Sequence, residues 1–333
     1  MKIIKPNLVL DRYNRFNDSN HDLRINRNIY APDIAIKKIQ EDPELADLLE
    51  KNIKPVTVSS ENVLNPRMFF ALRNAETDTN RVEFYCMGAN YLDLTYMTSS
   101  NDYVIDYNST YKEKEKCKRI TEIQNVFVIN QSKYEKFFGS FFYSLNPLCM
   151  TQKKIDNNVF LIDAESGFTR RGRSERCFMD FVFLVVNEGI ANLLFIESKR
   201  AGNKENERKQ EIGNHSETIK QIYEYGRLLE KNMNNVLEQF NYIISFYNGF
   251  GCELPLLDKT KSRIKLGLCV FRQNTIVDEN RSNNVMNEAK VLGCLARDVL
   301  INEASYAEEN IIDSHFEERA IDCILEMAKD FTK

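Results

Sequence analysis

The feature that most constrains the fold is a pair of apolar segments joined by a turn signal. Residues 178–186 (FMDFVFLVV) are rich in aromatic and β-branched residues, and the next three, Asn187-Glu188-Gly189, are typical of a tight turn. Residues 191–199 (ANLLFIESK) are apolar and end in charge. Together the two segments and the turn predict a β-hairpin.

A turn centred between Glu188 and Gly189 sets the register of this hairpin. It places Asp180 directly opposite Glu197, with both side chains on one face and their Cβ atoms about 5 Å apart. Lys199 lies two residues beyond Glu197 and shares its face. Two carboxylates this close repel each other, so both stay ionised only if a proton or a cation lies between them.

A divalent metal would satisfy this electrostatic requirement. Mg²⁺ takes hard oxygen ligands at about 2.0–2.1 Å and keeps several waters, and Mn²⁺ accepts the same ligands. Such an ion polarises a phosphoryl group and generates hydroxide. The ammonium of Lys199 would orient the attacking water or offset charge in the transition state. The structural alternative is a surface salt bridge between Glu197 and Lys199 or Arg200.

Composition limits the class of protein. The chain has 333 residues, 43% of them apolar and 11% aromatic, which excludes a disordered chain. No Pro/Gly/Ser-rich linker divides it, so we expect a single domain over 1–333. No apolar run approaches the ~20 residues of a membrane span, and the first ten residues do not resemble a secretory signal. The eight cysteines form no CxxC pair, which favours reduced thiols in an intracellular protein of the nucleus or cytoplasm.

The remaining elements are expected from periodicity and turn residues. The mixed order of helices and strands predicts an α/β or α+β fold with antiparallel pairs in the sheet. Ser216 is a plausible N-cap for the helix that follows it. The expected helices are 33–52, 130–144, 217–231, 287–304 and 317–331, and the expected strands beside the hairpin are 82–86, 91–96, 241–247 and 264–272.

An Asp, a strand, a turn, a second strand and Glu-x-Lys together resemble the PD-(D/E)XK nuclease superfamily. Within it, the chain resembles the DXO family of RNA 5′-end decapping and exonuclease enzymes over roughly residues 8–305. The segments that carry this resemblance are residues 10–18 with 23–24, 69–73 (FFALR), 132–135 (SKYE), 177–180 (CFMD), 197–199 (ESK), Gln221, 264–271 and 286–299.

The resemblance implies a fold and a site. The fold would be a PD-(D/E)XK-type core at about 130–275, built on two mixed twisted sheets flanked by helices, with residues 1–129 integral to it. The implied metal ligands are the carboxylates of Glu135, Asp180 and Glu197 and the carbonyl of Ser198. Lys199 and Gln221 would position the attacking water, and Arg73 would hold the 5′-terminal phosphate.

The resemblance also implies a reaction and its partners. The substrate would be an RNA 5′ end that carries a triphosphate, a cap or a monophosphate, processed with Mg²⁺ or Mn²⁺ and followed by 5′→3′ degradation. A 5′→3′ exoribonuclease would be the protein partner. A basic loop leads into the Asp180 strand, and its residues Arg171 and Arg173 are suited to bidentate contact with phosphate.

Three departures from the family pattern leave other functions open. Phe178 stands where the family carries a metal-binding Glu, and the hairpin register places it opposite Lys199. In addition, Gln131 replaces a Gly and Arg200 replaces a Ser or Thr. The second hypothesis is therefore a weakened or inactive homologue that binds RNA ends or serves as a scaffold for an exonuclease. The third is a DNA endonuclease of the same superfamily.

Overall fold

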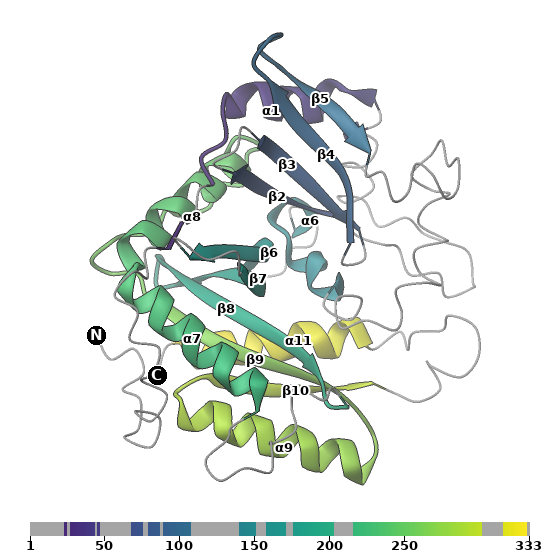
Figure 1. The fold of residues 1–333 in the computed structure, drawn as a ribbon, viewed down its shortest axis with the longest axis vertical. Coiled ribbons are helices and arrows are strands. Elements are labelled where there is room, and N and C mark those ends of the chain that lie inside the picture. Colours follow the sequence, from purple (N-terminus) through teal and green to yellow (C-terminus); the bar gives the residue numbers. More distant parts are fainter. Residues whose placement is uncertain are drawn as a thin grey trace, which may run out of the picture.

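Two β-sheets with helices packed around them form the fold (Figure 1). The computed structural model describes residues 23–24, 27–43, 45–46, 68–75, 79–86, 89–107, 140–150, 158–170, 176–202, 216–301 and 316–331. The predicted mixed α and β class, with two sheets and flanking helices, is confirmed. Only the larger sheet is mixed, however, because every strand pair of the smaller sheet is antiparallel.

The larger sheet has six strands in the order β1-β6-β7-β8-β9-β10, and the smaller has four in the order β2-β3-β4-β5. The strands of the larger sheet are β1 (Leu23–Arg24), β6 (Val159–Arg170), β7 (Arg176–Asn187), β8 (Ile190–Arg200), β9 (Ile264–Gln273) and β10 (Leu295–Ile301). Those of the smaller sheet are β2 (Met68–Ala75), β3 (Thr79–Cys86), β4 (Ala89–Met97) and β5 (Asp102–Tyr107).

The helices lie around these sheets. They are α1 (Pro32–Glu41), the short α6 (Pro147–Met150), α7 (Glu217–Lys231), α8 (Met233–Asn248), α9 (Ile276–Val291) and α11 (Phe316–Lys329), with a 3₁₀ turn η2 (Ser140–Leu145). No described helix is long and apolar enough to cross a membrane.

The β7–β8 hairpin forms in the predicted register. Its pairs run without a break from Asn187 opposite Ile190 to Phe181 opposite Ile196. Glu188 and Gly189 both have positive φ, at 50° and 74°, as a two-residue turn of the primed type requires. Residues 191–199 are buried because β7 and β9 pair with β8 on its two sides and helices cover the sheet.

Helices cover both faces of the larger sheet along its central strands. β8, β9 and β10 are parallel, so the chain returns between them through α7 and α8 and then through α9. On one face the ring of Phe195 packs against Phe240 of α8. On the other face, a Cβ added to Gly267 would meet the Sδ of Met327 in α11 at 3.1 Å. The side chain of Ile196 also lies next to this added Cβ, so Ile196 faces α11, whereas Phe195 faces α8. Successive residues of β8 therefore alternate between the α8 side and the α11 side of the sheet.

Several predicted elements are confirmed. Helix α7 spans Glu217–Lys231 as expected, and the Oγ of Ser216 accepts a hydrogen bond from the Ile219 N–H at 3.3 Å. The strands expected at 82–86, 91–96 and 264–272 lie within β3, β4 and β9, and α11 matches the last expected helix. Helix α1 ends at Glu41, and residues 47–52 of the predicted 33–52 helix lie outside the described residues.

Two predicted elements are wrong. The segment 241–247 is part of helix α8, not a strand, because buried residues recur at helical spacing from Val236 to Tyr247. The predicted helix 287–304 also fails, since α9 ends at Val291, Gly293 takes a φ of 77°, and strand β10 follows. Of the expected helix 130–144, residues 130–139 lie outside the described residues, and the described end is a 3₁₀ turn.

The core is continuous from the larger sheet to the smaller one. The ring of Phe70 in β2 stacks on Tyr247 and meets Phe246 edge-on, so the end of α8 covers one face of the four-stranded sheet. The ring of Phe142 in η2 packs edge-on against Phe181 and Phe183 of β7. Aromatic residues therefore link both sheets to the elements that flank them.

Candidate active site at the end of the hairpin

Charged and polar side chains gather where the hairpin ladder ends. Asp180 and Glu197 each lie one residue beyond the last pair, Phe181 with Ile196. Glu197 and Lys199 are 3% and 8% exposed, although β8 is otherwise an apolar strand. Burying an ionised group is costly unless a partner compensates it, so these charges need each other or a ligand.

Glu197 and Lys199 compensate each other in part. The Lys199 Nζ lies 3.0 Å from Glu197 Oε1, which shows that both side chains lie on one face of β8. This is the face of Phe195, two residues earlier, on the side covered by α8 and α7. An ion pair in these surroundings is screened much less than one at the surface.

Asp180 contacts the residue between them. Its Oδ2 accepts hydrogen bonds from the Ser198 backbone N–H and from the Ser198 Oγ, both at 2.7 Å. Bonds from two donors to one carboxylate oxygen hold that carboxylate at the end of β8. Ser198 pairs with Cys269 of β9, whose thiol faces α11, so the Asp180 contact lies on the α11 side of β8. Glu197 lies on the opposite, α8 side, so the described contacts do not bring the Asp180 and Glu197 carboxylates together on a single face, in contrast to the prediction from the hairpin register.

The oxygen donors at the end of the hairpin are of the chemical type that a hard cation takes, but the described contacts direct Asp180 and Glu197 to opposite sides of β8. The carboxylates of Asp180 and Glu197 and the carbonyl of Ser198 are the ligand types that Mg²⁺ and Mn²⁺ take. Asp180 is only half-buried and uses Oδ2 for Ser198. The third expected carboxylate, Glu135, lies outside the described residues. Within the described ranges, no three His, Cys, Asp or Glu side chains gather as a ready metal site.

Gln221 lies in the second turn of α7. Helix α7 begins after the chain leaves β8 and runs back across the larger sheet (Figure 1). The Oε1 of Gln221 is buried and accepts no hydrogen bond from the part of the chain that the structure describes. A buried amide oxygen without a donor is unfavourable, which makes Gln221 a candidate contact for a water or a substrate group. Its predicted role in catalysis stays a prediction.

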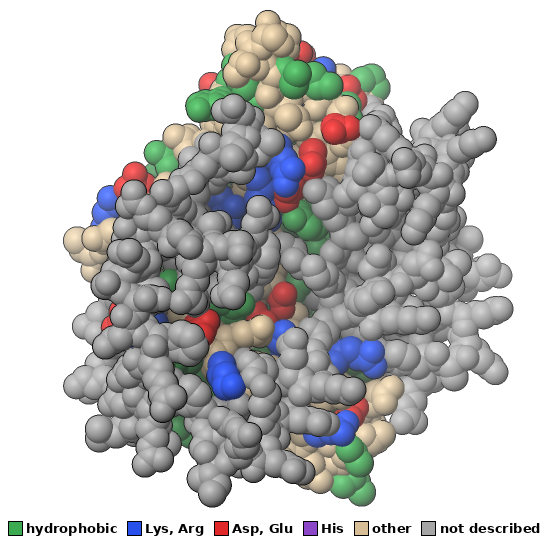
Figure 2. Space-filling model, viewed as in Figure 1, with side chains coloured by type: hydrophobic (Ala, Val, Ile, Leu, Met, Phe, Trp, Pro, Cys, Tyr) green, Lys and Arg blue, Asp and Glu red, His purple; other side chains and the backbone are tan. Residues whose placement is uncertain are grey.

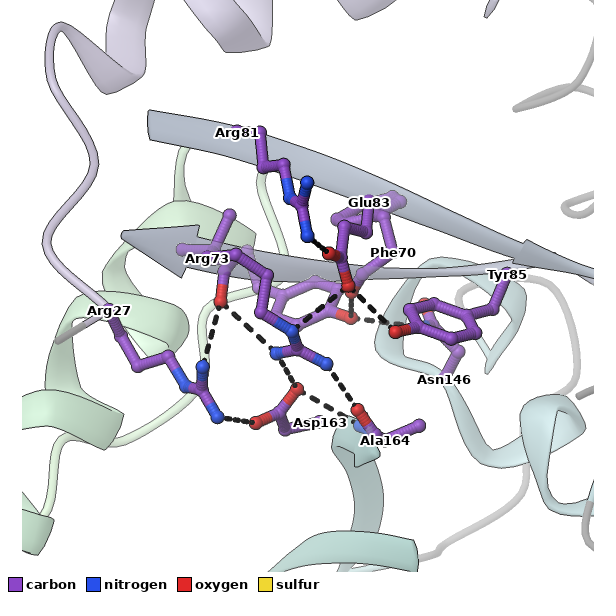
Figure 3. Close-up of polar contacts among 11 residues, drawn as sticks. Arg27, Phe70, Arg73, Arg81, Glu83, Tyr85, Asn146, Asp163 and Ala164 are labelled. Atoms are coloured by element: carbon purple, nitrogen blue, oxygen red, sulfur yellow. Dashed lines mark hydrogen bonds and ion pairs between the residues drawn. The ribbon is translucent and has the colours of Figure 1, made fainter. Parts of the chain in front are cut away.

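Arg73 lies in a different place, between the two sheets (Figure 3). Its Nε donates to Glu83 Oε2 at 3.0 Å, and its Nη1 donates to Asp163 Oδ1 at 2.9 Å. The other amino group donates to the Ala164 carbonyl at 2.5 Å. Because Arg73 belongs to β2 and Asp163 to β6, these bonds tie the smaller sheet to the larger one.

Further charges surround this contact. We use the name inter-sheet network for the side chains of Arg27, Arg73, Arg81, Glu83, Tyr85 and Asp163. Arg27 lies 3.1 Å from the second oxygen of Asp163, and the Tyr85 hydroxyl donates to Glu83 at 2.7 Å. Figure 2 shows basic and acidic side chains next to each other at the position where Figure 1 draws β2 and β3.

The network sets the ionisation of its members. Burial alone would raise the pKa of Glu83, but the positive charges of Arg73 and Arg81 outweigh it and lower that pKa. Burial is also the main reason why the pKa of Tyr85 is raised, so this hydroxyl stays protonated and donates to Glu83. The guanidinium of Arg73 is thus directed at internal acceptors, and its predicted contact with a 5′ phosphate stays a prediction.

Most of the remaining predicted site residues lie outside the part of the chain that the structure describes. Arg171 and Arg173 lie outside the described residues, as does Glu135. Phe178 belongs to β7, where its backbone pairs with Gly167 of β6. Sequence reasoning missed Asp163, although an acid within the apolar run of 159–164 was a signal that could have identified it.

Comparisons with protein-family models, with curated proteins and with solved structures found no match.

Proposed function

We propose that this protein is a metal-dependent hydrolase that processes RNA 5′ ends, as the sequence resemblance to the DXO family implies. One observation supports it most: an acid, a Ser and a Lys at the end of a buried central strand lie beside an acid from the adjacent strand. The buried Glu197 Oε1 and Lys199 Nζ lie 3.0 Å apart, and Asp180 accepts a hydrogen bond from Ser198, the residue between them in the sequence. These contacts support the proposal by bringing Asp180 to the end of the strand that carries the Glu-x-Lys residues, and a shared ion would require the Asp180 carboxylate to turn from Ser198 toward Glu197.

The side chains have separable tasks in this proposal. Asp180, Glu197 and the Ser198 carbonyl would hold Mg²⁺ or Mn²⁺, which supplies Lewis acidity and an activated water when bound. Ser198 keeps the Asp180 carboxylate at the strand end through its N–H and Oγ. Lys199 offsets the negative charge that develops on the phosphoryl oxygens, and its burial strengthens this effect. Gln221 offers a buried amide oxygen to orient the water.

The substrate class follows from the resemblance. We propose an RNA 5′ end bearing a triphosphate, a cap or a monophosphate, held by Arg171 and Arg173, and a 5′→3′ exoribonuclease as partner. Arg73 is left out of the substrate site, because its guanidinium donates to Glu83, Asp163 and backbone carbonyls.

A second function is favoured by the contacts of the acids. Asp180 accepts two hydrogen bonds from Ser198, and Glu197 has the ammonium of Lys199, so each carboxylate is compensated by protein groups. An arrangement compensated in this way is compatible with a homologue that binds RNA ends, or supports an exonuclease, without cleaving. None of the described contacts favours the DNA endonuclease hypothesis.

The test is cleavage of 5′-triphosphate and capped RNA with Mg²⁺ or Mn²⁺ by the wild type, Glu197→Gln and Lys199→Met. The matched control is Glu238→Gln, because Glu238 is exposed and pairs with the exposed Lys259, outside the hairpin end. We expect both site variants to lose about 100-fold or more of the rate and the control to keep it. Equal rates for wild type and Glu197→Gln would exclude this catalytic site. RNA binding without cleavage would favour the inactive RNA-end-binding or scaffold protein. Preferential cleavage of duplex DNA would favour the DNA endonuclease.

A further inference from the structure

Two thiols meet in the core on the α11 side of the larger sheet. The Sγ atoms of Cys269 in β9 and Cys323 in α11 lie 3.7 Å apart. Both cysteines are free, and their residues are 0% and 5% exposed. They belong to different elements that are separated by 54 positions in the sequence. A bond between them would join the central sheet to the last helix.

We propose that Cys269 and Cys323 are a reversible disulfide site, oxidised by a hydroperoxide or by a low-molecular-weight disulfide. A disulfide needs the sulfurs at about 2.05 Å, so they must approach by less than the width of one atom. Rotation about χ1 of each cysteine, with a small shift of α11, supplies this movement. The bond would fasten α11 to β9.

The reaction balances with either oxidant. With a hydroperoxide, the Cys323 sulfur attacks the terminal oxygen, and the O–O bond breaks to give a sulfenic acid and an alcohol, or water from hydrogen peroxide. The Cys269 sulfur then attacks the Cys323 sulfur, the S–O bond breaks, and water leaves. With a small disulfide, Cys323 forms a mixed disulfide and releases one thiol, and Cys269 displaces the second. The protein loses two hydrogen atoms in both cases. Cys323 reacts first because it is the less buried of the two.

Cys252 and Cys294, the other two cysteines whose side chains the structure describes, lack this arrangement. Cys252 is half-buried in the turn after α8, and burial raises its pKa to about 12. Cys294 is buried, and its thiol donates to the Leu295 carbonyl at 3.4 Å. Among the four cysteines whose side chains are described, Cys269 and Cys323 are the pair whose sulfurs contact each other. Cys252 therefore provides a matched control.

The experiment treats the full chain with oxidised glutathione or hydrogen peroxide, blocks free thiols with an alkylating agent in denaturant, and maps peptides by mass spectrometry without reduction. We expect a linked peptide pair containing Cys269 and Cys323 that disappears after reduction. Oxidation should also raise the thermal unfolding midpoint of the wild type and Cys252→Ala, but not of Cys323→Ala.

Alkylation of both Cys269 and Cys323 in the oxidised sample, or a linkage of either to another cysteine, would overturn the proposal. An identical rise of the midpoint in Cys323→Ala would also overturn it. If Cys323→Ala does not fold, the peptide map of the wild type decides alone. The map does not depend on RNA cleavage, so its result is independent of the proposed function.

Discussion

Replacing Arg73 by Ala is expected to loosen the two sheets from each other. Arg73 is 13% exposed at its side chain, and it joins Glu83 at 3.0 Å and Asp163 at 2.9 Å. Removing one partner of a buried ion pair costs about 3–5 kcal/mol, because an uncompensated charge remains. Here Asp163 keeps Arg27, and Glu83 keeps Arg81 and Tyr85. We therefore expect the low end of that range, about 3 kcal/mol.

The assay is thermal unfolding of Arg73→Ala followed by circular dichroism. For a chain of 333 residues, whose unfolding entropy is about 0.7 kcal/mol/K, the expected loss corresponds to a decrease in Tm of about 4 °C. The matched control is Arg227→Ala on α7. Arg227 is exposed and lies over the Tyr223 ring at 5.8 Å, a contact that contributes about 0.5–1 kcal/mol.

The reasoning is refuted if Arg73→Ala is no less stable than Arg227→Ala. A double-mutant cycle with Glu83→Gln isolates the contribution of the Arg73–Glu83 ion pair. A coupling energy near zero would show that this ion pair does not contribute to the loss of stability. RNA affinity measured below both transitions tests the other role predicted for Arg73. A lower affinity in a fully folded variant would return Arg73 to the substrate site.

Three further predictions concern stability. Gly267→Ala should destabilise by about 1–3 kcal/mol in urea unfolding, because the added Cβ overpacks the α11 face, and an unchanged midpoint would contradict that packing. Ser216→Ala should cost about 1 kcal/mol through the lost N-cap of α7, with Ser216→Asn retaining most of the stability. The pKa of Glu83 is lowered on folding, so its stabilisation is present above the unfolded value of 4.5 and is lost as pH falls through the folded pKa. The Tm of the wild type should therefore fall more steeply below pH 4.5 than that of Glu83→Gln, and parallel curves would disprove this contribution.

Local signals were sufficient for the hairpin and for α7. The turn residues Glu188 and Gly189 set the register of the hairpin, and Ser216 marks the N-cap of α7. Both signals act within a few residues of the chain. The strand expected at 241–247 failed for the opposite reason. Its seven residues are rich in β-formers, but the buried face that makes α8 a helix begins at Val236 and is visible only over a longer window.

Long-range contacts explain what else could not be predicted. Arg73 and Asp163 are 90 positions apart, and only the packing of the two sheets brings them together. The family resemblance implied that Arg73 contacts the substrate, because the local sequence pattern around an Arg does not show whether its side chain is exposed or buried. At the hairpin end, the register predicted where Asp180 and Glu197 lie along the strands. The hydrogen bonds of Asp180 to Ser198 depend on how the ladder ends, which no periodicity indicates.

The proposed function requires the end of the hairpin to bind a divalent metal. The most direct measurement is a crystal structure of the protein soaked with Mn²⁺, with anomalous diffraction recorded to locate the ion. We expect one peak within about 2.2 Å of carboxylate oxygens of both Asp180 and Glu197, and no peak there in Glu197→Gln. A map without a peak at these carboxylates, with the same crystals showing Mn²⁺ bound elsewhere, would contradict it.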